Sequence, residues 1–164
     1  MREIDQLRDS IGVLLIPELE QRGFRSRALT QDEARTEIGC AFPFGRLCRS
    51  RPAGVETVEV QFDKHGRPAF RLNMGTVPLT GIQHPIAGFI PTDDVWVTYL
   101  DRYYVLSERS VFRRWFSLRR SRTGTASQHD VERLVRGVVN ILGEVDALFR
   151  DGTCGPHVRE VNTT

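Results

Sequence analysis

Residues 55–77 read VETVEVQFDKHGRPAFRLNMGTV, and this stretch gives the clearest secondary-structure signal in the chain. Apolar and polar residues alternate over 57–62 and again over 70–75. The intervening residues 63–68 are rich in turn formers. Two period-two runs around such a turn predict a β-hairpin with one apolar and one polar face.

The polar face of this hairpin is a candidate binding surface. Setting Phe62 opposite Phe70 across the turn places Glu59 opposite Asn73 and Gln61 opposite Arg71. We expect the apolar face to be buried and the polar face to be solvated. A ligand or partner would use the polar face if the long, mostly irregular segment 76–94 folds over it.

Amphipathic helices are predicted at both ends of the chain. Residues 2–22 and 127–150 carry apolar residues three and four positions apart. Pro17 interrupts the first helix, which either kinks or restarts with Pro17 in its first turn. Ser127 and Asp130 form a start that resembles a capping box. The stripes predict six buried residues: Leu7, Ile11, Leu14, Leu134, Val138 and Leu142.

The remaining segments are less regular. Residues 38–42 alternate and are interpreted as a strand, and residues 46–54 as an exposed loop. Residues 95–100 are expected to form a third strand, which 103–106 continue or follow after a bend. Residues 153–164 are polar, so we expect a loose C-terminal tail.

These elements predict a single α+β domain over residues 1–152. In it, an antiparallel sheet of three to five strands is covered on one face by the N- and C-terminal helices. The composition agrees, because 164 residues with 40% hydrophobic and 27% charged content suit one globular domain. The sequence contains no signal-peptide pattern and no long apolar run, so a cytoplasmic location without a membrane partner is expected.

Residues 102–122 are strongly basic, with seven arginines against Glu108 alone. Such a cluster can bind an anion or a nucleic acid. Alternatively, the arginine stems cover the edge of the core and pair with acids elsewhere. The candidate contacts in this segment are Arg113, Arg114, Arg119 and Arg120.

Trp115 lies within the basic segment and has two interpretations. On an exposed surface it would stack on bases. If residues 112–116 form a helical turn, Phe112, Trp115 and Phe116 share one face and Trp115 anchors the core. We expect the core anchor.

The three cysteines and His157 offer one possible metal site. Cys154 and His157 are two residues apart, and Cys40 and Cys48 would complete a set of four ligands. The seven residues between Cys40 and Cys48 exceed the ~2–4 typical of zinc sites. No metal and no cofactor is therefore expected, and the odd number of cysteines argues against a disulfide framework.

The sequence offers one hypothesis in which the protein is an enzyme. His84 could act as a base with a cysteine or with the Asp93–Asp94 pair. The sequence contains none of the common hydrolase, phosphate-binding or dinucleotide-binding motifs. No catalytic residue is therefore assigned.

Several short motifs suggest a family. The stretches are LLIPELEQRGFRSR (14–27), TVEVQFD (57–63), FRLNMGTVP (70–78) and RRWFSL (113–118), followed by the last helix. Together they resemble the uncharacterised bacterial domain-of-unknown-function family 4304. The matching positions are a Gly-Phe-basic element, a strand glutamine and a Phe-x-x-Asn-x-Gly strand: Gly23, Phe24, Arg25, Gln61, Phe70, Asn73 and Gly75. The resemblance implies the α+β fold and no particular activity.

These observations favour a non-enzymatic binding or protein-interaction module. Another protein is the expected partner, and the oligomeric state is left open. The alternatives are a nucleic-acid or anion binder using residues 102–122, with nucleic acid not favoured, and a small enzyme using His84. The candidate binding residues are Glu59, Gln61, Arg71, Asn73, Arg113, Arg114, Arg119 and Arg120.

Overall fold

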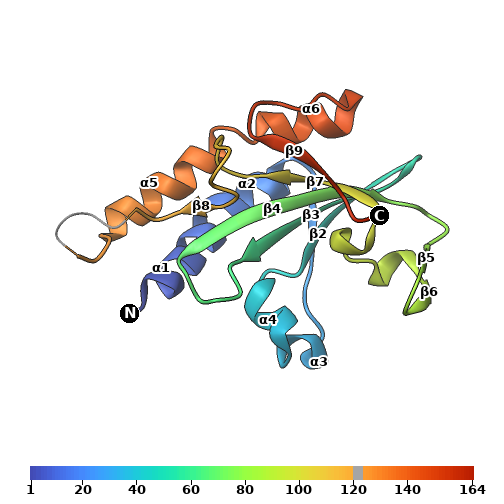
Figure 1. The fold of residues 1–164 in the computed structure, drawn as a ribbon, viewed down its shortest axis with the longest axis horizontal. Coiled ribbons are helices and arrows are strands. Elements are labelled where there is room, and N and C mark those ends of the chain that lie inside the picture. Colours follow the sequence, from blue (N-terminus) through green and yellow to red (C-terminus); the bar gives the residue numbers. More distant parts are fainter. Residues whose placement is uncertain (120–123) are drawn as a thin grey trace.

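A computed structural model describes residues 1–119 and 124–164. Within them, seven strands form one antiparallel sheet in the order β1-β2-β3-β4-β7-β9, with β8 also beside β4 (Figure 1). The strands are β1 (Arg25–Arg27), β2 (Arg46–Arg51), β3 (Gly54–Phe62), β4 (Ala69–Val77), β7 (Arg102–Leu106), β8 (Phe116–Ser117) and β9 (Val158–Asn162). The sheet confirms the α+β class, but the expected three to five strands were too few.

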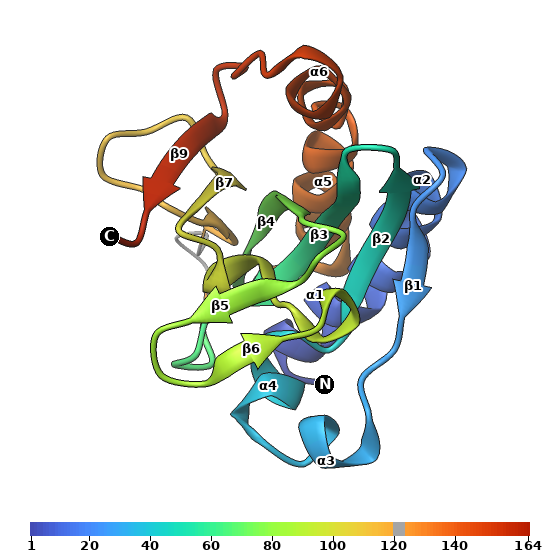
Figure 2. The same cartoon turned by 90° about the vertical axis from the view of Figure 1, so that its right-hand side faces the viewer.

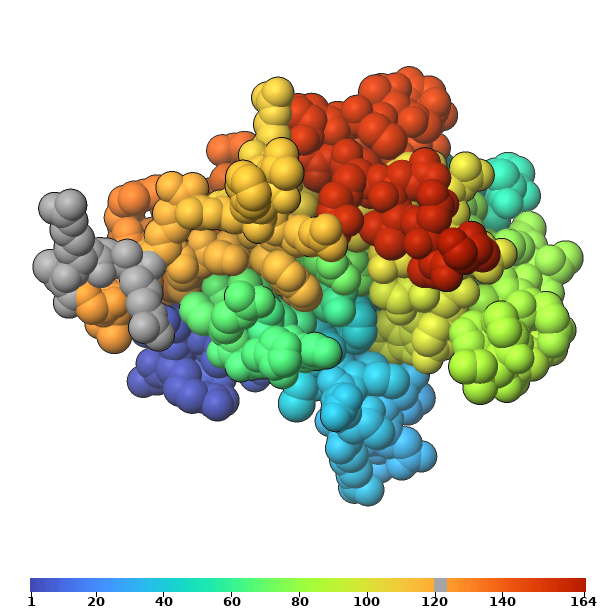
Figure 3. Space-filling model, in the orientation of Figure 1, coloured from blue at the N-terminus to red at the C-terminus, as the bar shows by residue number. Residues whose placement is uncertain are grey.

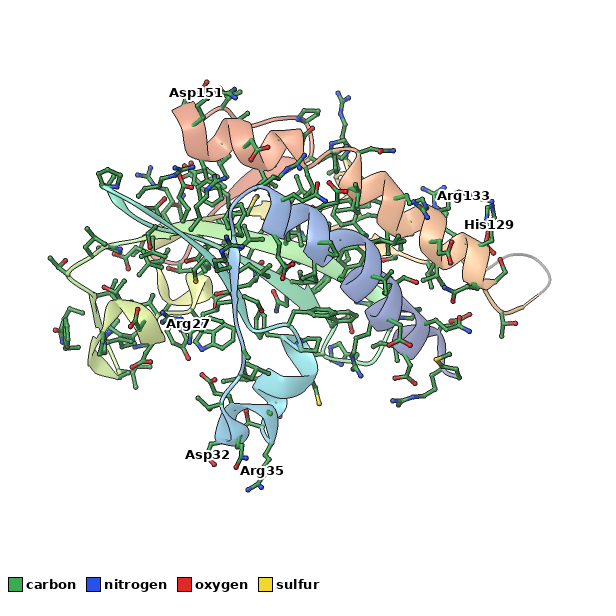
Figure 4. The ribbon with its side chains drawn as sticks, turned by 180° about the vertical axis from the view of Figure 1, so that it is seen from behind. Arg27, Asp32, Arg35, His129, Arg133 and Asp151 are labelled. Atoms are coloured by element: carbon green, nitrogen blue, oxygen red, sulfur yellow. The ribbon has the colours of Figure 1, made fainter. Side chains whose placement is uncertain are left out.

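The helices cover one face of this sheet. Seen from behind, α1, α2 and α5 lie across it (Figure 4). Among the described residues, the helical segments are α1 (Glu3–Ser10), the π-helix η1 (Ile11–Leu15), α2 (Ile16–Gln21), α3 (Gln31–Ala34), α4 (Glu37–Ala41), the 3-10 helices η2 (Thr92–Asp94) and η3 (Val97–Tyr99), α5 (Gln128–Val139) and α6 (Gly143–Asp151). None of them is long and apolar enough to cross a membrane.

The first helix accommodates Pro17 without breaking. Proline lacks an N–H, so it cannot donate to the carbonyl of Val13. The chain forms one π-helical segment just before Pro17, and α2 then starts with Pro17 in its first turn. This outcome matches the expected restart.

The hairpin pairs in the predicted register. Phe62 lies opposite Phe70, and Glu59 lies opposite Asn73. The inner face of β3 and β4 packs against the helix stripes in the main core. Of the six stripe residues, Leu14 and Leu134 are only half-buried, because they lie at the flanks of their stripes.

Two segments expected to be irregular are strands near the edges of the sheet. Residues 46–51 form β2, which pairs with β3, and the supposed tail contains β9, which pairs with β7. Each strand has one partly solvated side, so its sequence lacks a clear apolar alternation. The expectations of an exposed loop at 46–54 and of a loose tail at 153–164 were therefore wrong.

Three further segments differ in secondary structure from the sequence prediction. Residues 38–42 lie in or next to helix α4 rather than a strand, and the Thr36 hydroxyl caps α4 by accepting from the Ile38 N–H. Residues 95–100 contain the 3-10 helix η3, so the third long strand begins only at Arg102. The C-terminal helix is divided into α5 and α6.

The segment 78–100 folds into a lobe over the outer face of the sheet, opposite the helices. It contains the small hairpin β5 (Ile82–His84) and β6 (Gly88–Ile90), which stands in front of the sheet in Figure 2. The lobe approaches closely at Gly75, where an added Cβ would lie 2.8 Å from Leu100 and 3.3 Å from Val97. Glycine at this strand position lets the lobe pack down on the sheet.

Candidate functional site

The outer face of the sheet carries the polar residues predicted from the hairpin. Gln61 Oε1 accepts from Arg71 Nε and from Asn73 Nδ2, each at 2.9 Å. Glu59 and Asn73 are fully buried, and Gln61 and Arg71 are half-buried. The expectation of a solvated face was therefore wrong, because the lobe and the chain after β7 cover it.

Glu59 is a buried acid with an incomplete set of partners. Its Oε1 accepts from the Val97 N–H at 2.5 Å. Its Oε2 and the Asn73 Oδ1 across the strand pair are buried without a hydrogen bond in the described residues. Burial raises the pKa of Glu59 to about 7, although the Val97 N–H, Asn73 and Arg46 favour the ionised form. A proton on Oε2 would supply the donor that Asn73 Oδ1 lacks, so this acid suits a structural role.

Trp115 takes neither of its two predicted positions. Residues 112–116 are not helical, and β8 pairs Phe116 with Phe70 on the inner face of the sheet. Since neighbouring strand residues point to opposite faces, Trp115 lies on the outer face, half-buried. The Arg71 guanidinium lies over its ring, 4.6 Å from the centroid. Phe112 is 94% exposed, so the expected aromatic cluster was wrong.

Three guanidiniums gather beside Trp115. Arg71 belongs to β4, Arg114 precedes Trp115, and Arg159 comes from β9. Burial lowers the pKa of Arg71; Tyr103 raises it in part, and the charges of Arg159 and Arg114 lower it. Burial, followed by the charge of Arg114, also lowers the pKa of Arg159. The three side chains are therefore close enough to repel one another.

The sequence does not point to Arg159, because its pattern predicts a loose tail over residues 153–164. The signal available was weak, since Val158 and Val161 are three residues apart rather than two. Arg46 was missed for a similar reason. It is buried, donates to the Val95 carbonyl at 3.3 Å and lies 4.8 Å from the Trp96 ring centroid.

The second part of the candidate site is the arginine loop, residues 107–119. It projects in Figure 3 as the gold segment beside the red C-terminal strand. Glu108 Oε2 lies 3.7 Å from Arg113, and its Oε1 lies 3.8 Å from Arg119. At the tip, Val111 is 90% exposed and Phe112 94% exposed. The side chains of Arg109, Arg113 and Arg114 line a hollow of about 510 Å³ that reaches Arg159.

The predicted candidates thus separate into three groups. Glu59, Gln61 and Asn73 lie under the outer-face covering, and Arg71 joins Arg114 beside Trp115. Arg113 and Arg119 are held in the arginine loop by Glu108. Arg120 lies outside the described residues.

The residues of the enzymatic alternative are not brought together. His84 accepts from the Ile86 and Ala87 N–H groups and packs on Tyr99, and Asp93 pairs with Arg27 at 3.0 Å. Among the described residues, no hydrogen bond or ion pair joins His84 to a cysteine or to the aspartates.

The three cysteines are free thiols, and Cys48 lines a small hollow with Arg27, Arg46 and Asp93. Cys40 and Cys154 are exposed, whereas Cys48 is half-buried on β2. Burial raises the pKa of the Cys48 thiol, which disfavours a thiolate nucleophile. Within residues 1–119 and 124–164, no group of three or more histidine, cysteine or acidic side chains is placed to hold a metal ion.

Comparisons with known proteins identify no relative of this chain. No family model, no curated protein and no solved structure matches the chain.

Proposed function

We propose that the protein is a non-enzymatic binding module that docks an acidic segment of a partner protein on its arginine loop. The observation that carries the proposal is the exposed tip formed by Val111 and Phe112, surrounded by exposed arginines. Aromatic and arginine side chains are enriched among the residues that contribute most to protein interfaces. A partner segment that combines carboxylates with an apolar side chain would complement this loop in charge and in shape.

Nucleic-acid binding is the second candidate function. Phe112 stands between Arg109 and Arg113, where an unpaired base could stack on its ring. Acidic groups weigh against this candidate. Glu108 and Asp130 line a neighbouring hollow with Arg119, and both would repel a phosphate backbone. An acidic peptide would meet less repulsion from Glu108 and Asp130, because it is shorter and its carboxylates can be spaced to avoid them.

The proposal is tested by fluorescence anisotropy with a labelled 12-residue peptide of glutamate, aspartate and leucine. A single-stranded oligothymidine of similar charge serves as the competing ligand. We expect the peptide to bind more tightly than the oligonucleotide. Its affinity should fall with added salt, because exposed charges are screened over ~10 Å at 0.1 M salt.

Two variants and one control locate the contact. Phe112→Ala and Arg113→Gln should each weaken peptide binding several-fold. Arg35→Gln should leave it unchanged, because Arg35 is exposed at the end of α3, away from the arginine loop (Figure 4). Tighter binding of the oligonucleotide would favour the second candidate, and equal affinities for all variants would contradict both.

A further inference from the structure

We infer that Arg71, Arg114 and Arg159 form a binding site for a phosphate group. This inference goes beyond the docking of an acidic segment, because two of the three arginines belong to the sheet rather than to the arginine loop.

The sheet register places the two strand arginines on one face. Arg159 pairs with Val105 on β7, and Val105 pairs with Asn73 on β4. Arg159 therefore shares the outer-face row of Asn73, and Arg71 lies two residues farther along β4 on the same face. The loop contributes the third arginine, since Trp115 packs against Arg71 and Arg114 is its chain neighbour. Arg114 and Arg159 line the same hollow.

The orientation of Arg71 is fixed on two sides. Its Nε donates to Gln61, and its guanidinium plane lies over the Trp115 ring. Its terminal Nη groups donate to no described residue. An arginine held in this way loses little conformational entropy when it binds a ligand.

The three arginines form no ion pair in the part of the chain that the structure describes, and the one acid that lines the hollow, Glu108, pairs with Arg113 and Arg119 instead. Residues 120–123 contain no acid. The Nε of Arg159 is buried without a hydrogen-bond partner among the described residues. An unpaired buried donor beside repelling charges is costly, and a bound anion would relieve both penalties.

The number and shape of the charges favour phosphate over carboxylate. A phosphate group carries about two negative charges at neutral pH and offers three or four acceptor oxygens. Guanidinium forks match pairs of such oxygens. A carboxylate has one charge and two oxygens, so it would satisfy fewer of the three arginines. The hollow of about 510 Å³ beside Arg114 and Arg159 leaves room for a phosphate ester as well as for free phosphate. Glu108 lines the hollow at the loop end, and Arg71 approaches it from under the Trp115 ring rather than lining it.

The inference is tested by isothermal titration calorimetry in a chloride buffer at constant ionic strength. Inorganic phosphate, phenyl phosphate and acetate are titrated into the full chain. We expect both phosphates to bind and acetate to bind at least tenfold more weakly. Tighter binding of phenyl phosphate than of inorganic phosphate would identify an ester as the preferred source, and the reverse order would identify free phosphate.

Variants separate this site from the arginine loop. Arg71→Gln and Arg159→Gln should each weaken phosphate binding at least tenfold, whereas Arg136→Gln on α5 should not. Arg114→Gln changes an exposed side chain, so it tests the site even if the strand variants fail to fold. Phe112→Ala should leave phosphate binding intact, so the two proposals can fail separately. Absence of phosphate binding at millimolar concentration, or unchanged binding in Arg114→Gln and Arg159→Gln, would overturn the inference.

Discussion

Replacing Glu59 by glutamine should remove most of the pH dependence of stability between about pH 5 and 8. Burial raises the pKa of Glu59 from 4.5 to about 7. In that interval the native state keeps a proton that the unfolded chain releases, so the free energy of unfolding falls as pH rises. One pKa unit corresponds to ~1.4 kcal/mol, so the whole rise corresponds to about 3 kcal/mol. This stabilisation is fully present below pH 4.5 and is lost as pH rises through 7.

Glutamine should be tolerated at this position because it resembles the protonated acid. Its oxygen can accept from the Val97 N–H, and its amide nitrogen can donate to Asn73 Oδ1. Other shifted carboxyls do not interfere. The pKa values of Asp63 and Asp130 are lowered from 3.8, so both titrate below the window.

Urea unfolding at pH 5, 6, 7 and 8 measures the effect in wild type, in Glu59→Gln and in the exposed control Glu20→Gln. Relative to wild type, Glu59→Gln should become more stable by about 2–3 kcal/mol between pH 5 and pH 8, most of the full linkage. Glu20→Gln should follow wild type at every pH. A constant difference between wild type and Glu59→Gln across this range would refute the argument that burial controls this acid.

Further predictions concern stability and are checked by denaturant unfolding. Leu142→Ala should cost ~2–5 kcal/mol, because the side chain is fully buried at the turn between α5 and α6, whereas Arg133→Ala should stay within about ±0.5 kcal/mol; equal losses would contradict the burial of Leu142 in the core. Phe116→Ala should cost ~3–5 kcal/mol, while Phe112→Ala should leave stability unchanged; the reverse order would contradict the β8 register. Ser127→Ala should cost ~0.5–2 kcal/mol through loss of the capping box, and a neutral result would contradict it.

The parts of the fold that were predictable have strong local signals. The hairpin register follows from two period-two runs around a short turn, and the helix stripes follow from apolar spacing. The outer strands of the sheet, β1 and β2 at one side and β9 at the other, were not predictable in this way. Their order depends on hydrogen bonds to β3 and β7, which a local pattern does not encode.

The candidate site was predictable only in part. Arg71 and Arg114 were identified from polar alternation and from charge density. Their association with Arg159 depends on two strand pairings that cross β7, so no local sequence signal could bring the three together. Burial of Glu59 likewise depends on the lobe, because its covering residue Val97 lies 38 positions away in the chain. Long-range contacts therefore decide both the charge cluster and the state of the buried acid.

The most direct test of the proposed binding function is chemical-shift mapping of the ¹⁵N-labelled protein with the acidic peptide. Chemical-shift changes of the backbone amides should concentrate in residues 107–119, with the largest changes next to Phe112 and Arg113. Shifts confined to the β5–β6 lobe or to the exposed face of α5, or no shifts at millimolar peptide, would contradict the proposed function.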